Sequence, residues 1–179
     1  MGIILVTGGA RSGKSSFAEE RVKTYGKDIL YVATSIAFDD GMKDRIQKHR
    51  AQRPDYWETL ERYKAFKEIE VRPYDGVIVD CMTLMVSNLM LEYPGDFDQI
   101  SMAEVDVLEA SIFQEVKDFL EKFAHQNLVI VTNEVGMGLV PPYKMGNIFR
   151  DIAGRVNQFL AKQADEVYLA VSGIPVKIK

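Results

Sequence analysis

The stretch GGARSGKS, residues 8–15, has the residue types and the spacing needed to hold a chain of phosphate groups. It matches the pattern G-x-x-x-x-G-K-[ST], follows an apolar run directly and opens a helical pattern. Glycines let the loop turn tightly, so that backbone N–H groups point at phosphate oxygens, and the helix start adds its positive end. Lys14 can reach the β- and γ-phosphates, and Ser15 can ligate Mg²⁺. The alternative is a glycine-rich turn with a solvent-facing lysine, and the flanking strand and helix patterns argue against it.

Asp80 ends the apolar run VIVD, where an unpaired carboxylate at the end of a buried strand would be costly. In P-loop proteins an acidic residue at that place supports the Mg²⁺ ion of the bound triphosphate. Asp80 could also cap the helix expected to follow, and the two roles are compatible. The sequence therefore predicts a Mg²⁺–nucleoside triphosphate site, which leaves kinases, ATPases, GTPases and nucleotidyltransferases open.

The basic segment KDRIQKHRAQRP, residues 43–54, contains His49, one of the two histidines in the chain. If residues 39–52 form a helix, Arg45, His49 and Arg53 recur every four residues and share one face. A neutral imidazole is a good nucleophile toward phosphorus, and the nearby arginines lower the pKa of His49 by like-charge repulsion. The C-terminal end of the expected helix would raise that pKa, and the sequence does not decide between the two effects. On spacing alone, a solvated basic helix face with an incidental histidine is the favoured interpretation.

Two observations narrow the class of P-loop protein. The segment TNEVGMG, residues 132–138, lacks the Asn-Lys-x-Asp sequence that reads guanine in GTPase switches. No arginine-rich lid of a small-molecule kinase stands out by composition.

Asn133 and Glu134 are expected in a loop at the carboxyl end of a strand, where α/β proteins bind ligands. They could face a substrate or the nucleotide, while Gly136 and Gly138 could equally serve a turn.

These residues need a scaffold of strands and helices. Continuous apolar runs predict strands buried on both faces, as in a parallel sheet. Their alternation with helical patterns predicts an α/β, P-loop NTPase-type three-layer fold with a mostly parallel central sheet. The C-terminal sequence predicts a hairpin around Ser172-Gly173 that adds one antiparallel edge strand. Strands are expected at residues 3–7, 29–34, 76–81, 128–133 and 166–171, and helices near residues 14–25, 39–52, 61–70, 82–92, 103–125 and 146–164.

Length and composition favour one cytoplasmic domain that spans residues 1–179. The chain has the usual size of a single domain, without a linker or repeat. A net charge of −4 argues against a nucleic-acid or anionic-membrane binder. The N-terminal run lacks the features of a signal peptide, and no apolar stretch approaches the ~20 residues of a membrane span. The single cysteine, Cys81, fits a reducing compartment and is expected to fill core space.

Several segments together resemble the bifunctional adenosylcobinamide kinase / adenosylcobinamide-phosphate guanylyltransferase family of cobalamin biosynthesis, almost from end to end. Besides the P-loop VTGGARSGKSSFAE, the segments similar to family motifs are YVATS, RIQKHRAQRPDYWETLE, VDCMTLMVSNL, TNEVGMGLVP and FRDIAGRVNQFLAKQADEV, at residues 31–35, 45–61, 79–89, 132–141 and 149–167. One departure is Gly41, where the family often has an acidic residue. No role for that carboxylate is therefore carried over to this chain.

The resemblance implies two reactions. ATP or GTP phosphorylates the aminopropanol hydroxyl of adenosylcobinamide, and GTP then transfers GMP to adenosylcobinamide phosphate through a GMP–histidine intermediate at His49. We expect Lys14 and His49 to be catalytic, Ser15 and Asp80 to hold Mg²⁺, and the chain to form a homo-oligomer. The nucleotide-binding positions that the resemblance implies are Gly8, Gly9, Ala10, Arg11, Ser12, Gly13, Lys14, Ser15, Ala33, Thr34, Ser35, Arg50, Ala51, Gln52, Arg53, Glu61 and Asp80.

Other functions and roles stay open on the residues themselves. A P-loop kinase without guanylyl transfer is the alternative, and a nucleotide-gated binding module without turnover is a third hypothesis. Glu61 could hydrogen-bond the guanine or the ribose, or be a solvated glutamate at a helix start. Tyr31 and Trp57 are expected to be core aromatics rather than base-stacking platforms, and His125 is expected to be solvated at a helix end.

Overall fold

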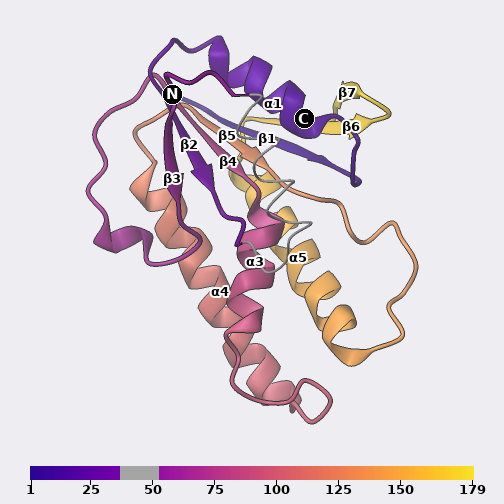
Figure 1. Cartoon of the computed structure of the whole chain (residues 1–179). Helices are drawn as coiled ribbons and strands as arrows, with labels where there is room; N and C mark the ends of the chain where they lie inside the picture. Colours follow the sequence, from indigo (N-terminus) through magenta and orange to yellow (C-terminus); the bar gives the residue numbers. More distant parts are fainter. Residues whose placement is uncertain (37–52) are drawn as a thin grey trace.

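The computed structural model describes residues 1–36 and 53–179. Within them, one seven-stranded sheet has the order β3-β2-β4-β5-β1-β6-β7 (Figure 1). Neighbouring strands run parallel except for β6 and β7, which are antiparallel, so the predicted sheet is confirmed. The strands are β1 (Ile3–Gly8), β2 (Ile29–Ala33), β3 (Glu58–Glu61), β4 (Gly76–Asp80), β5 (Leu128–Val131), β6 (Glu166–Val171) and β7 (Ile174–Lys177). The helices are α1 (Lys14–Lys23), η1 (Phe66–Glu68), α3 (Met82–Leu91), α4 (Met102–Lys122) and α5 (Lys144–Gln163).

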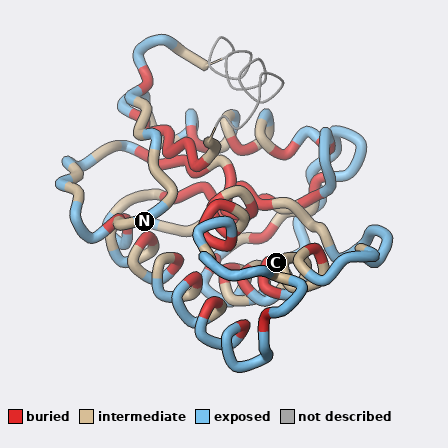
Figure 2. Tube along the Cα trace, turned by 60° about the horizontal axis from the view of Figure 1, so that its bottom comes forward, coloured by how far each residue is buried: buried red, intermediate tan, exposed pale blue. Residues whose placement is uncertain are grey.

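Helices cover both faces of the sheet and make three layers. On one face, Ala18 and Val22 of α1 pack against Ile4 and Val6 of β1. On the other face, Leu5 of β1 packs into a larger core that α3, α4 and α5 complete. Because successive residues of a strand point to opposite faces, the all-apolar runs supply both cores at once. Figure 2 shows the buried segments gathered in these strands and in the helix faces against them.

The predicted helix near residues 61–70 is wrong. Residues 58–61 form the edge strand β3, which pairs in parallel with Leu30–Ala33 of β2, and only the short 3-10 helix η1 follows. Ala65 has φ of 57°, a left-handed conformation that does not occur inside an α-helix. Pairing with the open edge of β2 therefore overrode the local helical pattern.

The other elements predicted within the described residues are confirmed with small shifts of their ends. Helix α4 begins at a capping box, in which the Ser101 side chain accepts from the Glu104 N–H and the Glu104 carboxylate accepts from the Ser101 N–H. At the C-terminal hairpin, Ser172 and Gly173 have φ of 51° and 83°, and the two-residue type I′ turn requires such positive values. The helix predicted over residues 39–52 lies outside the described residues. Among the described residues, no helix is sufficiently long and apolar to span a membrane.

Candidate nucleotide-binding site

The loop between β1 and α1 has the tight conformation that its glycines allow. Gly13 directly precedes α1 and has φ of 87°, where any other residue would be strained. At Gly8, an added Cβ would lie 2.5 Å from the carbonyl oxygen of Ala170 and 2.7 Å from Oγ of Ser12. Helix α1 then begins at Lys14, so its unpaired N–H groups face the loop. The loop therefore has the form of an anion-binding turn.

Lys14 lies back against this loop. The residue is 8 % exposed, and Nζ donates a hydrogen bond of 2.8 Å to the carbonyl oxygen of Gly9. A lysine that merely faces solvent is therefore excluded as an interpretation. The Lys14 ammonium group beside the N-terminus of α1 makes this loop positively charged, which favours an anion.

Asp80 is half-buried at the carboxyl end of β4, and Tyr31 of β2 holds its side chain. The Tyr31 hydroxyl donates a hydrogen bond of 2.9 Å to Oδ2 of Asp80. Burial, together with the adjacent Asp80 charge, raises the pKa of Tyr31 well above its usual value of 10, so the hydroxyl stays a donor. The guanidinium carbon of Arg53 lies 3.3 Å from the centre of the Tyr31 ring. Asp80 is not the N-cap of α3, because that position is Cys81, whose side chain makes no capping hydrogen bond.

Glu19 of α1 joins this polar group, and the sequence did not point to it. Burial raises the pKa of Glu19, the charges of Lys23 and Arg53 oppose that rise, and the charge of Asp80 adds to it. The Glu19 carboxylate is therefore coupled electrostatically to Arg53 and Asp80. Its only signal in the sequence is a position five residues after Lys14, which is not distinctive.

Three residues predicted to bind nucleotide stand side by side on neighbouring strands of the sheet. Ala33 of β2 pairs with Glu61 of β3 on one side and with Asp80 of β4 on the other. Glu61 is exposed and ends a strand, rather than starting a helix as expected. Thr34 ties two strand ends together, because its Oγ1 accepts from the Cys81 N–H at 3.0 Å and donates to the Cys81 carbonyl oxygen at 2.7 Å.

The loop after β5 lies between the P-loop strand and the Asp80 strand, because β5 is flanked by β1 and β4. The Glu134 N–H donates to the carbonyl oxygen of Gly8 at 3.0 Å. The Asn133 N–H donates to Oγ1 of Thr83 at 2.6 Å, and Nδ2 of Asn157 donates to the Asn133 carbonyl oxygen at 3.0 Å. The predicted loop at the carboxyl end of a strand is confirmed, and which ligand it faces stays a prediction.

Four predicted site residues, His49, Arg50, Ala51 and Gln52, lie outside the described residues, as does Gly41. Their described neighbours are informative. Ser35 is half-buried just beyond the carboxyl end of β2, and Arg53 stacks on Tyr31 of the same strand. Ser35 and Arg53, described residues on either side of the segment 37–52, therefore both lie beside β2, the strand that pairs with the Asp80 strand.

The remaining sequence predictions concern core packing and solvent exposure. Tyr31 and Trp57 are 1 % and 6 % exposed, which confirms them as core aromatics. Cys81 is buried, as expected, and His125 is exposed just beyond the end of α4.

The donor set fits a Mg²⁺ ion that arrives with a nucleotide. Ser15 lies in the first turn of α1 and Asp80 at the end of β4, and both offer hard oxygen donors. Mg²⁺ usually takes one or two protein oxygens together with substrate phosphates rather than a cage of protein ligands. Residues 1–36 and 53–179 contain no group of three or more His, Cys, Asp or Glu side chains able to hold a metal.

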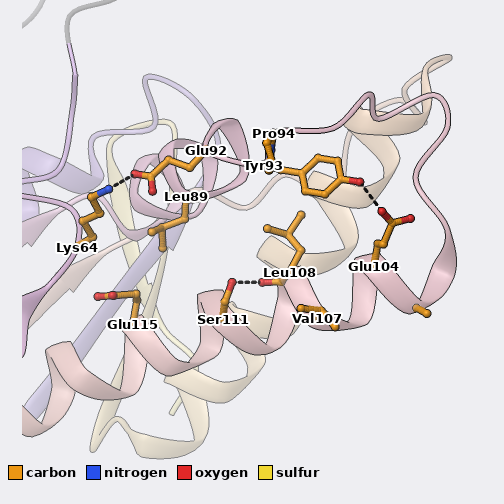
Figure 3. A pocket seen from close by; sticks show the side chains of 11 residues that line it. Lys64, Leu89, Glu92, Tyr93, Pro94, Glu104, Val107, Leu108, Ser111 and Glu115 are labelled. Carbon is orange, nitrogen blue, oxygen red and sulfur yellow. Dashed lines mark hydrogen bonds and ion pairs between the residues drawn. The ribbon is translucent and has the colours of Figure 1, made fainter.

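A cavity of about 570 Å³ lies between the end of α3 and the first half of α4, and Figure 3 shows its walls. Leu89, Val107 and Leu108 supply apolar surface. The charged side chains of its wall are paired, as Lys64 and Glu92 show with a 2.7 Å ion pair. Among the predicted nucleotide residues that the structure describes, none lines this cavity.

The family model described as cobinamide kinase / cobinamide phosphate guanyltransferase matches residues 4–178. The bifunctional adenosylcobalamin biosynthesis protein CobU of Escherichia coli K12 is 46% identical over 182 residues, covering 99% of both chains. CobU of Salmonella typhimurium LT2 is 44% identical, also over 99% of both chains. The bifunctional adenosylcobalamin biosynthesis protein CobP of Pseudomonas aeruginosa PAO1 is 34% identical, over 98% of this chain and 96% of that protein.

A solved structure, the flagellar accessory protein FlaH of Methanocaldococcus jannaschii, aligns with a TM-score of 0.44 and 14% identity, over 94% of this chain and 70% of that chain. So low a similarity carries no inference about function. The family model and the relatives, by contrast, cover almost the whole chain. The chain belongs to the cobinamide kinase / cobinamide phosphate guanyltransferase family.

Proposed function

We propose that both reactions of the family, phosphorylation of adenosylcobinamide and guanylyl transfer to adenosylcobinamide phosphate, use one nucleotide site at the carboxyl edge of the sheet. The observation that carries this proposal is the loop from Gly8 to Ser15, which joins β1 to α1 with Lys14 folded against it. Both reactions begin with a nucleoside triphosphate, and a loop that binds its phosphates serves either transfer.

In the kinase reaction, the triphosphate of ATP or GTP lies along the loop, and Lys14 interacts with the β- and γ-phosphates. The substrate hydroxyl oxygen bonds to the γ-phosphorus, the bond from that phosphorus to the bridging oxygen breaks, and the hydroxyl proton leaves to solvent. The nucleoside diphosphate stays bound to the loop. Mg²⁺, held by Ser15 and Asp80, would neutralise charge on the phosphate oxygens.

In the guanylyl transfer, His49 is the nucleophile. Its neutral imidazole nitrogen bonds to the α-phosphorus of GTP, and pyrophosphate leaves. An oxygen of adenosylcobinamide phosphate then bonds to the same phosphorus, the P–N bond breaks, and His49 is regenerated. The α-phosphorus must therefore be open to the imidazole while the loop and Lys14 stabilise the leaving pyrophosphate.

The placement of Arg53 supports this role for His49. His49 is four positions before Arg53 in the chain, so their Cα atoms are at most roughly 14 Å apart. Arg53 stacks on the ring whose hydroxyl holds Asp80, so a stretch of chain this short would let His49 reach the same edge of the sheet. Arg50 and Arg53 would clamp phosphate oxygens, and Glu61 would hydrogen-bond the guanine or the ribose.

The proposal includes the setting of the enzyme. One domain spanning residues 1–179 carries both activities, in the cytoplasm and as a homo-oligomer, without nucleic acid as a partner. Its cargo is a large corrinoid, and the other substrates are GTP and ATP. The net charge of −4 supports the exclusion of nucleic acid.

Intact-mass measurement after incubation with GTP and Mg²⁺ tests the mechanism. We expect an acid-labile GMP adduct that disappears in His49→Ala, whereas kinase activity with ATP persists. His125→Ala, at the exposed second histidine, is the matched control and should keep the adduct. Lys14→Ala should lose both activities.

The results also separate the competing functions. A kinase without guanylyl transfer forms no adduct, and an adduct that persists in His49→Ala excludes this histidine as the nucleophile. Guanylyl transfer at full rate in Lys14→Ala would exclude a shared site. Slow triphosphate hydrolysis without phosphorylation of cobinamide would favour a binding module.

A further inference from the structure

The turn of the C-terminal hairpin lies directly against the P-loop. The Gly173 N–H donates a hydrogen bond of 2.9 Å to the carbonyl oxygen of Ser12. A Cβ added to Gly13 would lie 2.9 Å from the Cα of Gly173, closer than real Cβ contacts allow. Gly8 meets the end of β6 in the same way, at the carbonyl oxygen of Ala170. Both ends of the phosphate loop therefore rest on this hairpin.

The hairpin itself is held at its other end. The Ile178 N–H donates to the carbonyl oxygen of Val167 at 2.8 Å. The Lys179 ammonium donates to the carbonyl oxygens of Ala161 and Ala164, at the end of α5, at 3.0 and 2.6 Å. Strand β6 is parallel to β1, with Ala170 opposite Gly8. These contacts with α5 and β1 hold the turn in position against the rest of the protein.

The bond to Ser12 determines which way one peptide unit of the P-loop faces. In a trans peptide, the carbonyl oxygen and the following N–H point in opposite directions. With the Ser12 carbonyl directed at Gly173, the Gly13 N–H is directed away from the turn, as a phosphate-binding loop needs. Rotation of this peptide unit would instead present a carbonyl oxygen to the phosphates, which repels them.

We propose that the Ser172–Gly173 turn is a positioning element of the phosphate site, in which the Gly173 N–H holds the Ser12–Gly13 peptide unit in its anion-binding orientation. Gly173 is a positioning residue, since it acts through the P-loop backbone. This inference rests on the proposed function of the loop. Because both transfers use the same loop, the turn supports both activities equally.

The test replaces the N–H of Gly173 by oxygen, by incorporating glycolic acid at this position. This change removes the donor and leaves φ and ψ unrestricted by a side chain. The matched control is Gly173→Asn, which keeps the N–H and tolerates positive φ, and whose Cβ would meet nothing within 4 Å. Calorimetry with inorganic tripolyphosphate and Mg²⁺ reads the phosphate site alone, and steady-state kinetics give KM for GTP.

We expect the ester protein to bind tripolyphosphate about tenfold more weakly than wild type and to show a matching rise of KM in both reactions. The Gly173→Asn protein should stay within about twofold, and both proteins should melt within a few degrees of wild type. A merely structural turn would lower the melting temperature and leave the affinity of the folded protein unchanged. Tripolyphosphate affinity within twofold of wild type in the ester protein, or an equal loss in Gly173→Asn, overturns the inference.

Lys14→Ala separates this inference from the proposed function. If it binds tripolyphosphate as tightly as wild type, the P-loop is not the phosphate site and both proposals fail. If it loses binding while the ester protein does not, only the positioning role fails. Should the ester protein not fold, a hairpin with a four-residue turn in place of Ser172-Gly173 moves the donor away while keeping the strand pairing. Unchanged tripolyphosphate binding by that protein equally overturns the inference.

Discussion

Removing the Tyr31 hydroxyl tests directly whether its hydrogen bond orients the Asp80 carboxylate. This hydroxyl belongs to a buried residue of β2 and donates a 2.9 Å hydrogen bond to Oδ2 of Asp80. The Arg53 guanidinium covers the Tyr31 ring. The variant Tyr31→Phe removes one oxygen atom and keeps the ring, its packing and the stacked guanidinium. The change therefore isolates the bond to the carboxylate.

The expected size of the effect follows from the kind of bond. A hydrogen bond to a charged group contributes about 1.5–3 kcal/mol, because the acceptor is left without its partner when the bond is lost. For a protein of this length, a loss of about 2 kcal/mol lowers the melting temperature by ~4–8 °C. If Asp80 supports Mg²⁺, the loss of this orienting partner should also weaken the response to Mg²⁺ by about tenfold or more.

The assay is a Mg²⁺ titration of GMP-adduct formation, with thermal melting measured on the same samples. The control is Tyr63→Phe, which breaks a similar bond of 2.6 Å between a tyrosine hydroxyl and the carboxylate of Glu92, at a more exposed place. The control should keep the wild-type Mg²⁺ response. If Tyr31→Phe shows the same half-saturating Mg²⁺ concentration as wild type, Asp80 is not a group whose orientation matters for the metal.

Two further predictions concern the core. Burial raises the pKa of Cys81 to about 12, so the thiol should stay protonated and unreactive in the native protein at pH 8. Mass spectrometry should find no iodoacetamide label on Cys81 in the native protein and full labelling after unfolding. Phe119 is fully buried, and the centre of its ring lies 5.1 Å from that of Phe66 and 5.0 Å from that of Phe123. Phe119→Ala should therefore lower the free energy of unfolding, measured by urea titration, by about 3–5 kcal/mol. By contrast Lys67→Ala, which removes a surface ion pair with Asp118, should lower the free energy of unfolding far less, and a comparable loss in both variants would refute the assignment of the stability to the core.

The parts of the fold that the sequence predicted are those with local causes. The loop at Gly8–Ser15 depends on glycines and a lysine whose spacing is visible in eight residues. The central strands are continuous apolar runs because both of their faces are buried, as at Val77 and Ile78 of β4. Turn chemistry at Ser172-Gly173 likewise sets the hairpin without help from distant residues.

Strand β3 shows where local patterns stop being informative. It lies at the edge of the sheet, and its four residues are half-buried or exposed, so it has no apolar run to mark it. Residues 58–61 form a strand because their backbone pairs with the edge of β2, which is almost 30 residues away along the chain. The order of the strands is hidden for the same reason, because no local feature places β5 between β1 and β4.

The candidate site inherits this dependence on register. Glu61 stands level with Asp80 only because Ala33 pairs with both, and a slip of β3 by one residue would carry the Glu61 side chain to the opposite face of the sheet. The same applies to Gly173, which meets the P-loop because β6 is aligned with β1 so that Ala170 stands opposite Gly8. Sequence motifs indicate which chemistry each strand end carries. The register between strands decides which of those ends act together, and at Glu61 and Gly173 that register comes from contacts between segments far apart in the chain.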